Sequence, residues 1–222
     1  MVVMKAVTKA FKNGNQLTNV LNGISLEIHS GDMISIMGPS GSGKSTLLHI
    51  LGGLDKPTSG LYQIDGKEVS TLTDKELAKL RNRRFGFIHQ NFMLLEEESV
   101  LENVSVPLLF GDKPLKHIDR IAIETLEQLG MTTFIEKKVN TLSGGEKQRV
   151  AIARAIVHQP DIILADEPTG ALDQKNTEKI MEHFIKLNKK GKTILIITHD
   201  PQVASQCKQQ FKMIDGQLLQ IV

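Results

Sequence analysis

The sequence has 222 residues, 40% of them hydrophobic and 23% charged, which is ordinary for a globular protein with one substantial core. Its net charge of +2 is too small to indicate a nucleic-acid partner, for which a strongly basic face is expected. The longest apolar runs fall far short of the ~20 residues that span a bilayer, and no signal-peptide core is present. We therefore expect a cytoplasmic chain that cannot transport a solute alone. Its one cysteine, Cys207, excludes an internal disulfide and is expected to be structural.

Residues 2–30 alternate loosely between apolar and polar side chains on both sides of the turn signal Asn13-Gly14. This pattern predicts two antiparallel strands. Phe11 is either a core aromatic or a stacking surface for an adenine ring, and taken alone the core interpretation is favoured.

A glycine-rich segment lies between an apolar run at 33–37 and a helical pattern at 46–51. This order of strand, loop and helix is the context of the phosphate-binding P-loop, G-x-x-x-x-G-K-[ST]. Glycines let successive backbone N–H groups approach the phosphates, and the helix N-terminus adds partial positive charge. Lys44 can reach the β- and γ-phosphates, and the Ser45 hydroxyl can bind a bridging Mg²⁺. A flexible linker, the alternative, does not explain a lysine and two hydroxyls at this register. The segment comprises Gly38, Pro39, Ser40, Gly41, Ser42, Gly43, Lys44, Ser45 and Thr46.

The next part of the chain predicts a turn at 52–60, a short strand at 61–66 and a helix that begins with a capping box at Thr73-x-x-Glu76. We expect Arg81 and Arg84 on that helix to form a solvated face. A strand at 85–90 then ends in the polar residue Gln90.

Helical patterns dominate from 91 to 160, which predicts a helical subdomain inserted into an α/β core. Its last helix begins with Ser143, Gly144, Gly145 and Glu146. Ser143-x-x-Glu146 has the form of a capping box, but a helix N-terminus with two bare glycines can also bind phosphate.

The core resumes with an apolar run at 162–165 that ends in Asp166 and Glu167. Asp166 is suited to hold Mg²⁺, and Glu167 is the candidate general base for the attacking water. A helix at 174–190 and a second apolar run, which ends at His199, follow. A last strand pair is expected around 211–216.

Strands that alternate with helices predict a mostly parallel sheet with polar residues along one edge. The expected fold is therefore α/β, a P-loop NTPase core with an N-terminal antiparallel β subdomain. We expect a single domain over 1–222, in which 1–90 and 161–222 form the nucleotide-binding core and 91–160 the helical subdomain.

With these motifs in order, the chain resembles the nucleotide-binding domain of ATP-binding-cassette (ABC) transporters. Residues 142–146, Leu-Ser-Gly-Gly-Glu, match the family signature. The resemblance implies that two copies pair head to tail, with each Mg-ATP between the P-loop of one copy and the signature residues Ser143, Gly144, Gly145 and Glu146 of the other. It also implies that Phe11 stacks on adenine, which reverses the preference stated above. The remaining residues that match family motifs are Gln90 of the Q-loop, which binds the metal, the Walker-B residues Asp166 and Glu167, Ala171-Leu172-Asp173 of the D-loop and the switch residue His199. Asp173 can equally be an N-cap for the helix that follows.

Segments 53–60 and 164–173, and residues 80–81 before 85–87, are similar to the lipoprotein-release and macrolide-export branch. That branch implies separately encoded integral membrane permease subunits at the cytoplasmic face of the plasma (inner) membrane. It also implies export or extracytoplasmic work on lipoprotein, peptide or drug. The alternative is a regulatory ABC ATPase that gates a cell-envelope or sensor partner without transport. The acidic run Glu96-Glu97-Glu98 either meets a basic partner or is a solvated turn.

Two further rivals are less consistent with the sequence. A soluble ABC protein that acts on DNA or ribosomes is disfavoured because the helical insertion is too short for a long coiled coil. A P-loop kinase is disfavoured by the signature and by Glu167.

Overall fold

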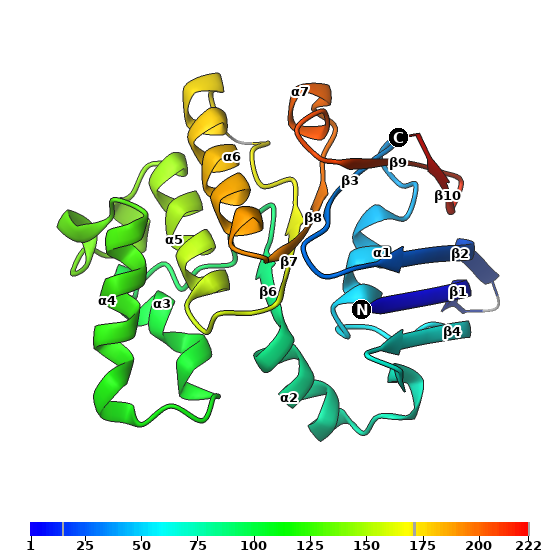
Figure 1. Ribbon diagram of the computed structural model, residues 1–222, viewed down its shortest axis with the longest axis horizontal. Coiled ribbons are helices and arrows are strands. Elements are labelled where there is room, and N and C mark those ends of the chain that lie inside the picture. The colour runs from blue at the N-terminus through cyan, green and yellow to red at the C-terminus, as the bar shows by residue number, and fades with distance from the viewer. Residues whose placement is uncertain (15, 171, 222) are drawn as a thin grey trace.

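The computed structural model describes residues 1–14, 16–170 and 172–221. Two sheets lie beside a group of helices (Figure 1). The first is a four-stranded antiparallel sheet in the order β2-β1-β4-β5. Its strands are β1 (Val2–Asn13), β2 (Gln16–Ile28), β4 (Ser59–Ile64) and β5 (Lys67–Glu68). The predicted N-terminal pair of antiparallel strands is confirmed, and β4 joins it on the other side of β1.

The second sheet has six strands in the order β10-β9-β3-β8-β7-β6, and all are parallel except β10. The central strands β7 and β8 read as continuous apolar runs because both of their faces are buried. The six strands are β3 (Met33–Met37), β6 (Phe85–Ile88), β7 (Ile162–Asp166), β8 (Thr193–Ile197), β9 (Gln209–Ile214) and β10 (Gln217–Gln220).

The two faces of the six-stranded sheet pack against different helices. Because strand side chains alternate between faces, Ile194 and Ile196 of β8 point to one core and Leu195 and Ile197 to the other. The second core also contains helix α1 (Lys44–Leu51) and the antiparallel sheet, so α1 lies between the two sheets (Figure 1). The first core is covered by α3 (Val100–Leu109), α4 (Ile118–Gln128), α5 (Gly144–Ile156) and α6 (Gln174–Lys189).

The smaller elements complete the chain. Helix α2 (Asp74–Arg84) begins at the predicted Thr73 cap, and the short α7 (Pro201–Ala204), which was not predicted, is capped by Asp200. The 3₁₀ turns are Val69–Thr71, Leu115–His117, Thr132–Phe134 and Val139–Thr141.

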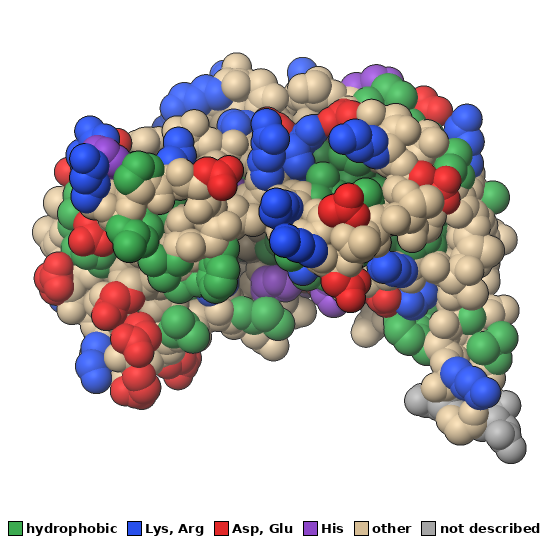
Figure 2. Space-filling view, turned by 90° about the horizontal axis from the view of Figure 1, so that it is seen from below, with side chains coloured by type: hydrophobic (Ala, Val, Ile, Leu, Met, Phe, Trp, Pro, Cys, Tyr) green, Lys and Arg blue, Asp and Glu red, His purple; other side chains and the backbone are tan. Residues whose placement is uncertain are grey.

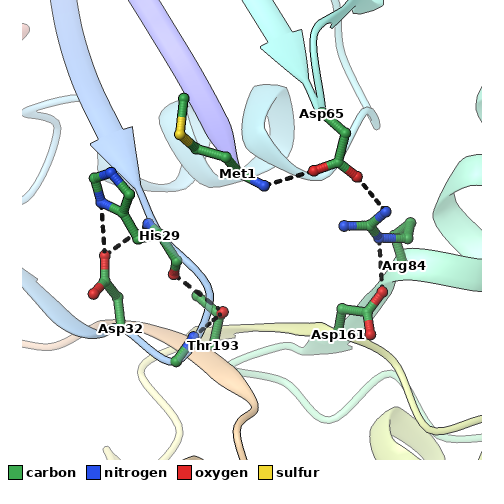
Figure 3. Close-up of polar contacts among 8 residues, drawn as sticks. Met1, His29, Asp32, Asp65, Arg84, Asp161 and Thr193 are labelled. Atoms are coloured by element: carbon green, nitrogen blue, oxygen red, sulfur yellow. Dashed lines mark hydrogen bonds and ion pairs between the residues drawn. The ribbon is translucent and has the colours of Figure 1, made fainter.

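The prediction that Arg81 and Arg84 form a solvated face is wrong. Arg81 donates from Nη1 to the Gly53 carbonyl at 2.9 Å. Arg84 lies between two carboxylates (Figure 3): its Nη1 pairs with Asp65 Oδ2, and its Nε lies 2.8 Å from Asp161 Oδ2. Asp65 follows β4 and Asp161 precedes β7, so Arg84 ties the antiparallel sheet to the parallel one. A charged helix face can be solvated or paired, and the sequence alone does not distinguish the two.

Candidate functional site

A cavity of about 520 Å³ opens at the edge of the six-stranded sheet where its parallel strands end. This edge is the expected ligand site of an open α/β sheet. Each of β3, β6, β7 and β8 leads into residues that line it, so segments far apart in the sequence meet there. The lining residues are Val20, Gly38, Ser40, Gly41, Gly43, Lys44, Ser45, Thr46, Gln90, Asp166, Glu167 and His199.

The P-loop glycines are needed where the chain makes close approaches. Gly43 caps α1 with φ at 101°, a left-handed conformation that side chains disfavour. A Cβ on Gly38 would lie 2.2 Å from the Met213 carbonyl oxygen, so no other residue fits between the loop and β9. Ser42 Oγ is buried without a hydrogen-bond partner among the described residues. The loop is thus held by its backbone, as a phosphate cradle requires.

Lys44 lies along the inside of this loop. Its Nζ donates to the carbonyl oxygens of Gly38 at 2.9 Å and Pro39 at 2.8 Å. These bonds hold the ammonium over the cradle, where it can exchange carbonyl partners for phosphate oxygens. Pro39 thus contributes its carbonyl, and it does not itself line the cavity.

Glu167 and His199 make direct contact across the ends of β7 and β8. Glu167 Oε2 lies 3.0 Å from His199 Nδ1 and accepts the His199 backbone N–H at 3.4 Å. The Glu167 backbone is left-handed, with φ at 48°, and its N–H donates to the Ile197 carbonyl at 2.9 Å. Such a backbone costs about 1–3 kcal/mol and persists only where its surroundings fix it. It separates the direction of Glu167 from that of its neighbour Asp166.

The oxygen donors in the cavity suit Mg²⁺. The Ser45 hydroxyl, the Asp166 carboxylate and the Gln90 amide line the same cavity, and Mg²⁺ prefers oxygen ligands from a few side chains plus phosphates and water. The described residues contain no cluster of three His, Cys, Asp or Glu that could hold a metal ion.

The signature lies outside this cavity, at the N-terminus of α5. Ser143 and Gly144 are exposed, and the space beside Gly145 is bounded at 3.5 Å by Asn176 of α6. Asn176 bonds to both carboxylate oxygens of Asp173, which caps α6. The alternative role considered for Asp173, an N-cap, is therefore confirmed. The signature and this part of the D-loop adjoin each other, while Ala171 lies outside the described residues.

Phe11 is 42% exposed and does not line the cavity. The Lys9 ammonium lies over its ring, 4.8 Å from the centroid, and is anchored by Asp55 at 2.6 Å. The hairpin residue that does line the cavity is Val20 on β2. Sequence reasoning missed Val20 because a valine in a strand carries no signal beyond its β-propensity.

The acidic run after Gln90 has partners within the chain. Glu96 lies 3.0 Å from Lys147 of α5, and Glu97 lies 3.6 Å from Lys138 and 3.2 Å from Asn140. These contacts tie the segment after the Q-loop to the signature helix and the turn before it.

Comparison with known proteins decides the family. The family model described as ABC transporter matches residues 21–170. The chain belongs to the ABC transporter family. It is 47% identical over 216 residues to the lipoprotein-releasing system ATP-binding protein LolD of Alcanivorax borkumensis, with 96% of this chain and 94% of that protein covered. It is 44% identical over 216 residues to the macrolide export ATP-binding/permease protein MacB of Bdellovibrio bacteriovorus, with 97% of this chain and 33% of that protein covered.

Among solved structures, the chain matches the dimeric ATP-binding cassette MJ0796 in a post-hydrolysis state bound to ADP and Pi. The TM-score is 0.92 at 45% identity, with 98% of this chain and 96% of that chain covered. The predicted fold class and the resemblance to the lipoprotein-release and macrolide-export branch are therefore confirmed. The chain is an ATP-binding ATPase subunit of an ABC transporter.

No helix in the described part of this ABC ATPase has the length and apolar character needed to cross a bilayer.

Proposed function

We propose that two copies of this chain pair head to tail around two Mg-ATP and drive separately encoded permease subunits from the cytoplasmic face of the membrane. One observation carries the proposal: the cavity contains the P-loop and the acidic residues, but the signature lies outside it on an exposed helix end. A nucleotide bound by the P-loop is therefore free to meet the signature of a second copy. The dimeric form of MJ0796 supports this arrangement.

The cavity residues have distinct proposed roles in hydrolysis. Lys44 and the P-loop N–H groups hold the phosphates, and Ser45, Asp166 and Gln90 hold Mg²⁺, which neutralises charge on the β- and γ-phosphates. Glu167 accepts the proton of the attacking water, and His199 positions the Glu167 carboxylate. Most of the rate enhancement would come from positioning and charge stabilisation.

Ser143, Gly144 and Gly145 of the second copy complete the phosphate shell through the N-terminus of α5. Glu146, in the same turn, accepts hydrogen bonds from the hydroxyl and the backbone N–H of Ser143. Asp173 keeps the neighbouring D-loop in place. Phe11 remains a proposed adenine platform: its exposed ring can stack on a base.

A groove on the underside of the molecule is the proposed permease contact. Figure 2 views this face and shows a central hollow that contains a histidine, with basic side chains gathered along one side of it and hydrophobic side chains along the other. The groove has a volume of about 590 Å³, and its lining includes no acidic residue among those described. Its apolar surface comes from Leu54, Phe85, Phe87, Met93, Val106, Pro107 and Phe110, and its basic side chains are Lys75, Lys79, Arg81 and Arg154.

The groove chemistry favours one kind of occupant, a cytoplasmic permease helix with an apolar face and acidic residues beside it. His158 also lines the groove: in the tautomer protonated at Nε2, the ring donates to the Phe85 carbonyl at 3.0 Å, and its Nδ1 is buried with no hydrogen-bond partner among the described residues. Burial lowers the pKa of His158, which favours this neutral form.

The groove and the nucleotide cavity meet at consecutive residues. His89 lines the groove, with its ring stacked on Phe87, and Gln90 lines the nucleotide cavity. Beyond them, Arg154 of α5 holds the carbonyls of Phe92 and Met93. A helix that moves in the groove would therefore displace residues next to Gln90 and residues bound to the signature helix. This supports the proposal that the chain transmits ATP binding to a permease.

The relatives support export or extracytoplasmic work on a lipoprotein, peptide or drug. LolD is named for lipoprotein release, and MacB for macrolide export. The chain spans about a third of the length of MacB, whose name includes a permease.

A mixing experiment tests the shared site. One variant, Lys44→Ala, loses the phosphate contact of its P-loop. The other variant, Gly145→Asp, carries a carboxylate at its signature. The Cβ of the substituted residue 145 would make ordinary 3.5 Å contact with Asn176, so this variant should fold. Neither variant alone should hydrolyse ATP, but a mixture contains dimers with one intact P-loop facing one intact signature. Recovery of phosphate release on mixing supports the head-to-tail dimer, and no recovery contradicts it.

A further inference from the structure

Glu146 engages the signature serine through two hydrogen bonds. Its Oε2 accepts the hydroxyl of Ser143 at 2.7 Å and the backbone N–H of Ser143 at 2.7 Å. The carboxylate is therefore held at the N-terminus of α5, beside the exposed signature residues.

This arrangement occupies two Ser143 donors that a phosphate could use. A serine hydroxyl has one proton, and here that proton is directed to Glu146. The Ser143 oxygen then presents only lone pairs to its surroundings, and these repel phosphate oxygens. The carboxylate also offsets the positive end of the helix dipole, on which anion binding depends.

The carboxylate is charged at neutral pH. The hydrogen bond from the Ser143 hydroxyl is the largest cause that lowers the pKa of Glu146, and the hydrogen bond from the Ser143 backbone N–H is the next. Arg149 and Lys137 act in the same direction. The two cations reduce the negative potential around Glu146, but neither forms an ion pair with it.

The same cap occurs at two other helices of the chain. Thr73 and Glu76 form it at α2, and Ser99 and Glu102 form it at α3, with hydroxyl-to-carboxylate distances of 2.7 and 2.6 Å. In those positions the cap has a structural role only, because neither belongs to the proposed nucleotide site. At α5 the corresponding hydroxyl-to-carboxylate bond lies at the surface that the partner's γ-phosphate would contact.

We propose that Glu146 is a positioning residue that withholds Ser143 from the nucleotide and so weakens dimer closure. The γ-phosphate of ATP bound by the other copy must replace the Glu146 carboxylate as the acceptor of the hydrogen bond from the Ser143 hydroxyl. It must do so although the carboxylate repels it. A γ-phosphate can compete because it is a multiply charged acceptor, whereas ADP has none to offer. Glu146 thereby sets the threshold at which ATP closes the dimer. This inference rests on the proposed head-to-tail site.

The matched test is Glu146→Gln, placed in a chain that also carries Glu167→Gln so that hydrolysis does not intervene. Glutamine keeps an oxygen that can accept both Ser143 bonds, but it lacks the charge. We measure the dissociation constant of the Mg-ATP-dependent dimer by analytical ultracentrifugation at low and at high ionic strength. Each dimer has two signatures, so at low ionic strength we expect the dissociation constant to fall about tenfold.

Two controls separate charge from structure. Glu127→Gln removes one carboxylate from the exposed side of α4 and should leave the dissociation constant unchanged. High ionic strength should shrink the gain from Glu146→Gln, because salt screens repulsion and has little effect on a neutral packing difference. ADP affinity of the monomer should be the same in all variants, since the P-loop is intact.

The outcomes distinguish the inference from the proposal beneath it. If the Glu167→Gln parent forms an ATP-dependent dimer and Glu146→Gln does not tighten it, the role of Glu146 is overturned while the shared site stands. If the parent does not dimerise at all, the head-to-tail site fails and the inference falls with it.

Discussion

The carboxylate of Glu167 and the imidazole of His199 lie 3.0 Å apart, from Oε2 to Nδ1, at the ends of two adjacent strands. The Glu167 side chain is 12% exposed, while that of His199 is 71% exposed. The partly buried acid thus contacts a largely exposed histidine at the mouth of the cavity. This pairing fixes the direction of the proposed base before any substrate enters, and it gives His199 a positioning role.

Replacement of His199 by alanine should slow hydrolysis more than it weakens binding. Glu167 would keep only the longer backbone contact from His199, at 3.4 Å, and its carboxylate would lose orientation. We expect kcat for phosphate release to fall about 10- to 100-fold, less than the ~10²–10⁴-fold that a general base itself contributes, with ATP affinity nearly unchanged. Equal kcat in the variant and the native chain would contradict the positioning role.

The Lys44→Ala variant should lose nucleotide affinity. Charge-assisted contacts to phosphate are worth about 1.5–3 kcal/mol, so the Kd for ATP should rise about 10- to 100-fold. Calorimetric titration measures this directly. Lys116→Ala, which removes the same charge from an exposed turn before α4, is the control and should bind ATP as the native chain does. Similar affinities for all three chains would exclude Lys44 from phosphate binding.

Phe110→Ser should weaken attachment to the permease. Phe110 lies in the groove and is 78% exposed, so its replacement removes a docking contact without opening the core. Leu115 is 76% exposed but does not line the groove, which makes Leu115→Ser the matched control. Co-sedimentation with inverted membrane vesicles that contain the permease should be reduced for Phe110→Ser only. An equal reduction for both variants would indicate a non-specific effect of surface polarity.

The Cys207 thiol should lower the free energy of unfolding at high pH. Burial raises the pKa of its thiol from 9.0 to about 11, against a smaller opposing effect of Ser35. Above about pH 9 the unfolded chain loses the thiol proton before the folded chain does, so the free energy of unfolding falls as pH rises toward 11. The fall should be about 2 kcal/mol, measured by urea unfolding near pH 8 and near pH 11. In Cys207→Ala this part of the fall should disappear, and an unchanged pH dependence would contradict the assignment.

The sequence predicted much of this molecule because its signals are local. A glycine-rich loop between a strand and a helix, two acids after an apolar run and a capping box are each determined by neighbouring residues. Since parallel strands end at one edge, the convergence of Gln90, Glu167 and His199 also followed from the strand pattern.

Other features depend on pairings that span many residues. Arg84 meets Asp65 and Asp161, and Lys147 meets Glu96, through packing that no periodicity encodes. Val20 joins the cavity only because β2 passes beside the P-loop. The position of the signature outside the cavity likewise depends on how α5 is placed relative to the sheet, which the local sequence does not specify.

The most direct test of the account is the molar mass of Glu167→Gln in Mg-ATP, measured by multi-angle light scattering together with phosphate release. The account predicts a lasting ATP-dependent dimer and a loss of turnover of at least about 100-fold, since the site closes but the base is gone. A variant that stays monomeric and hydrolyses ATP at the native rate would contradict both the shared site and the role of Glu167.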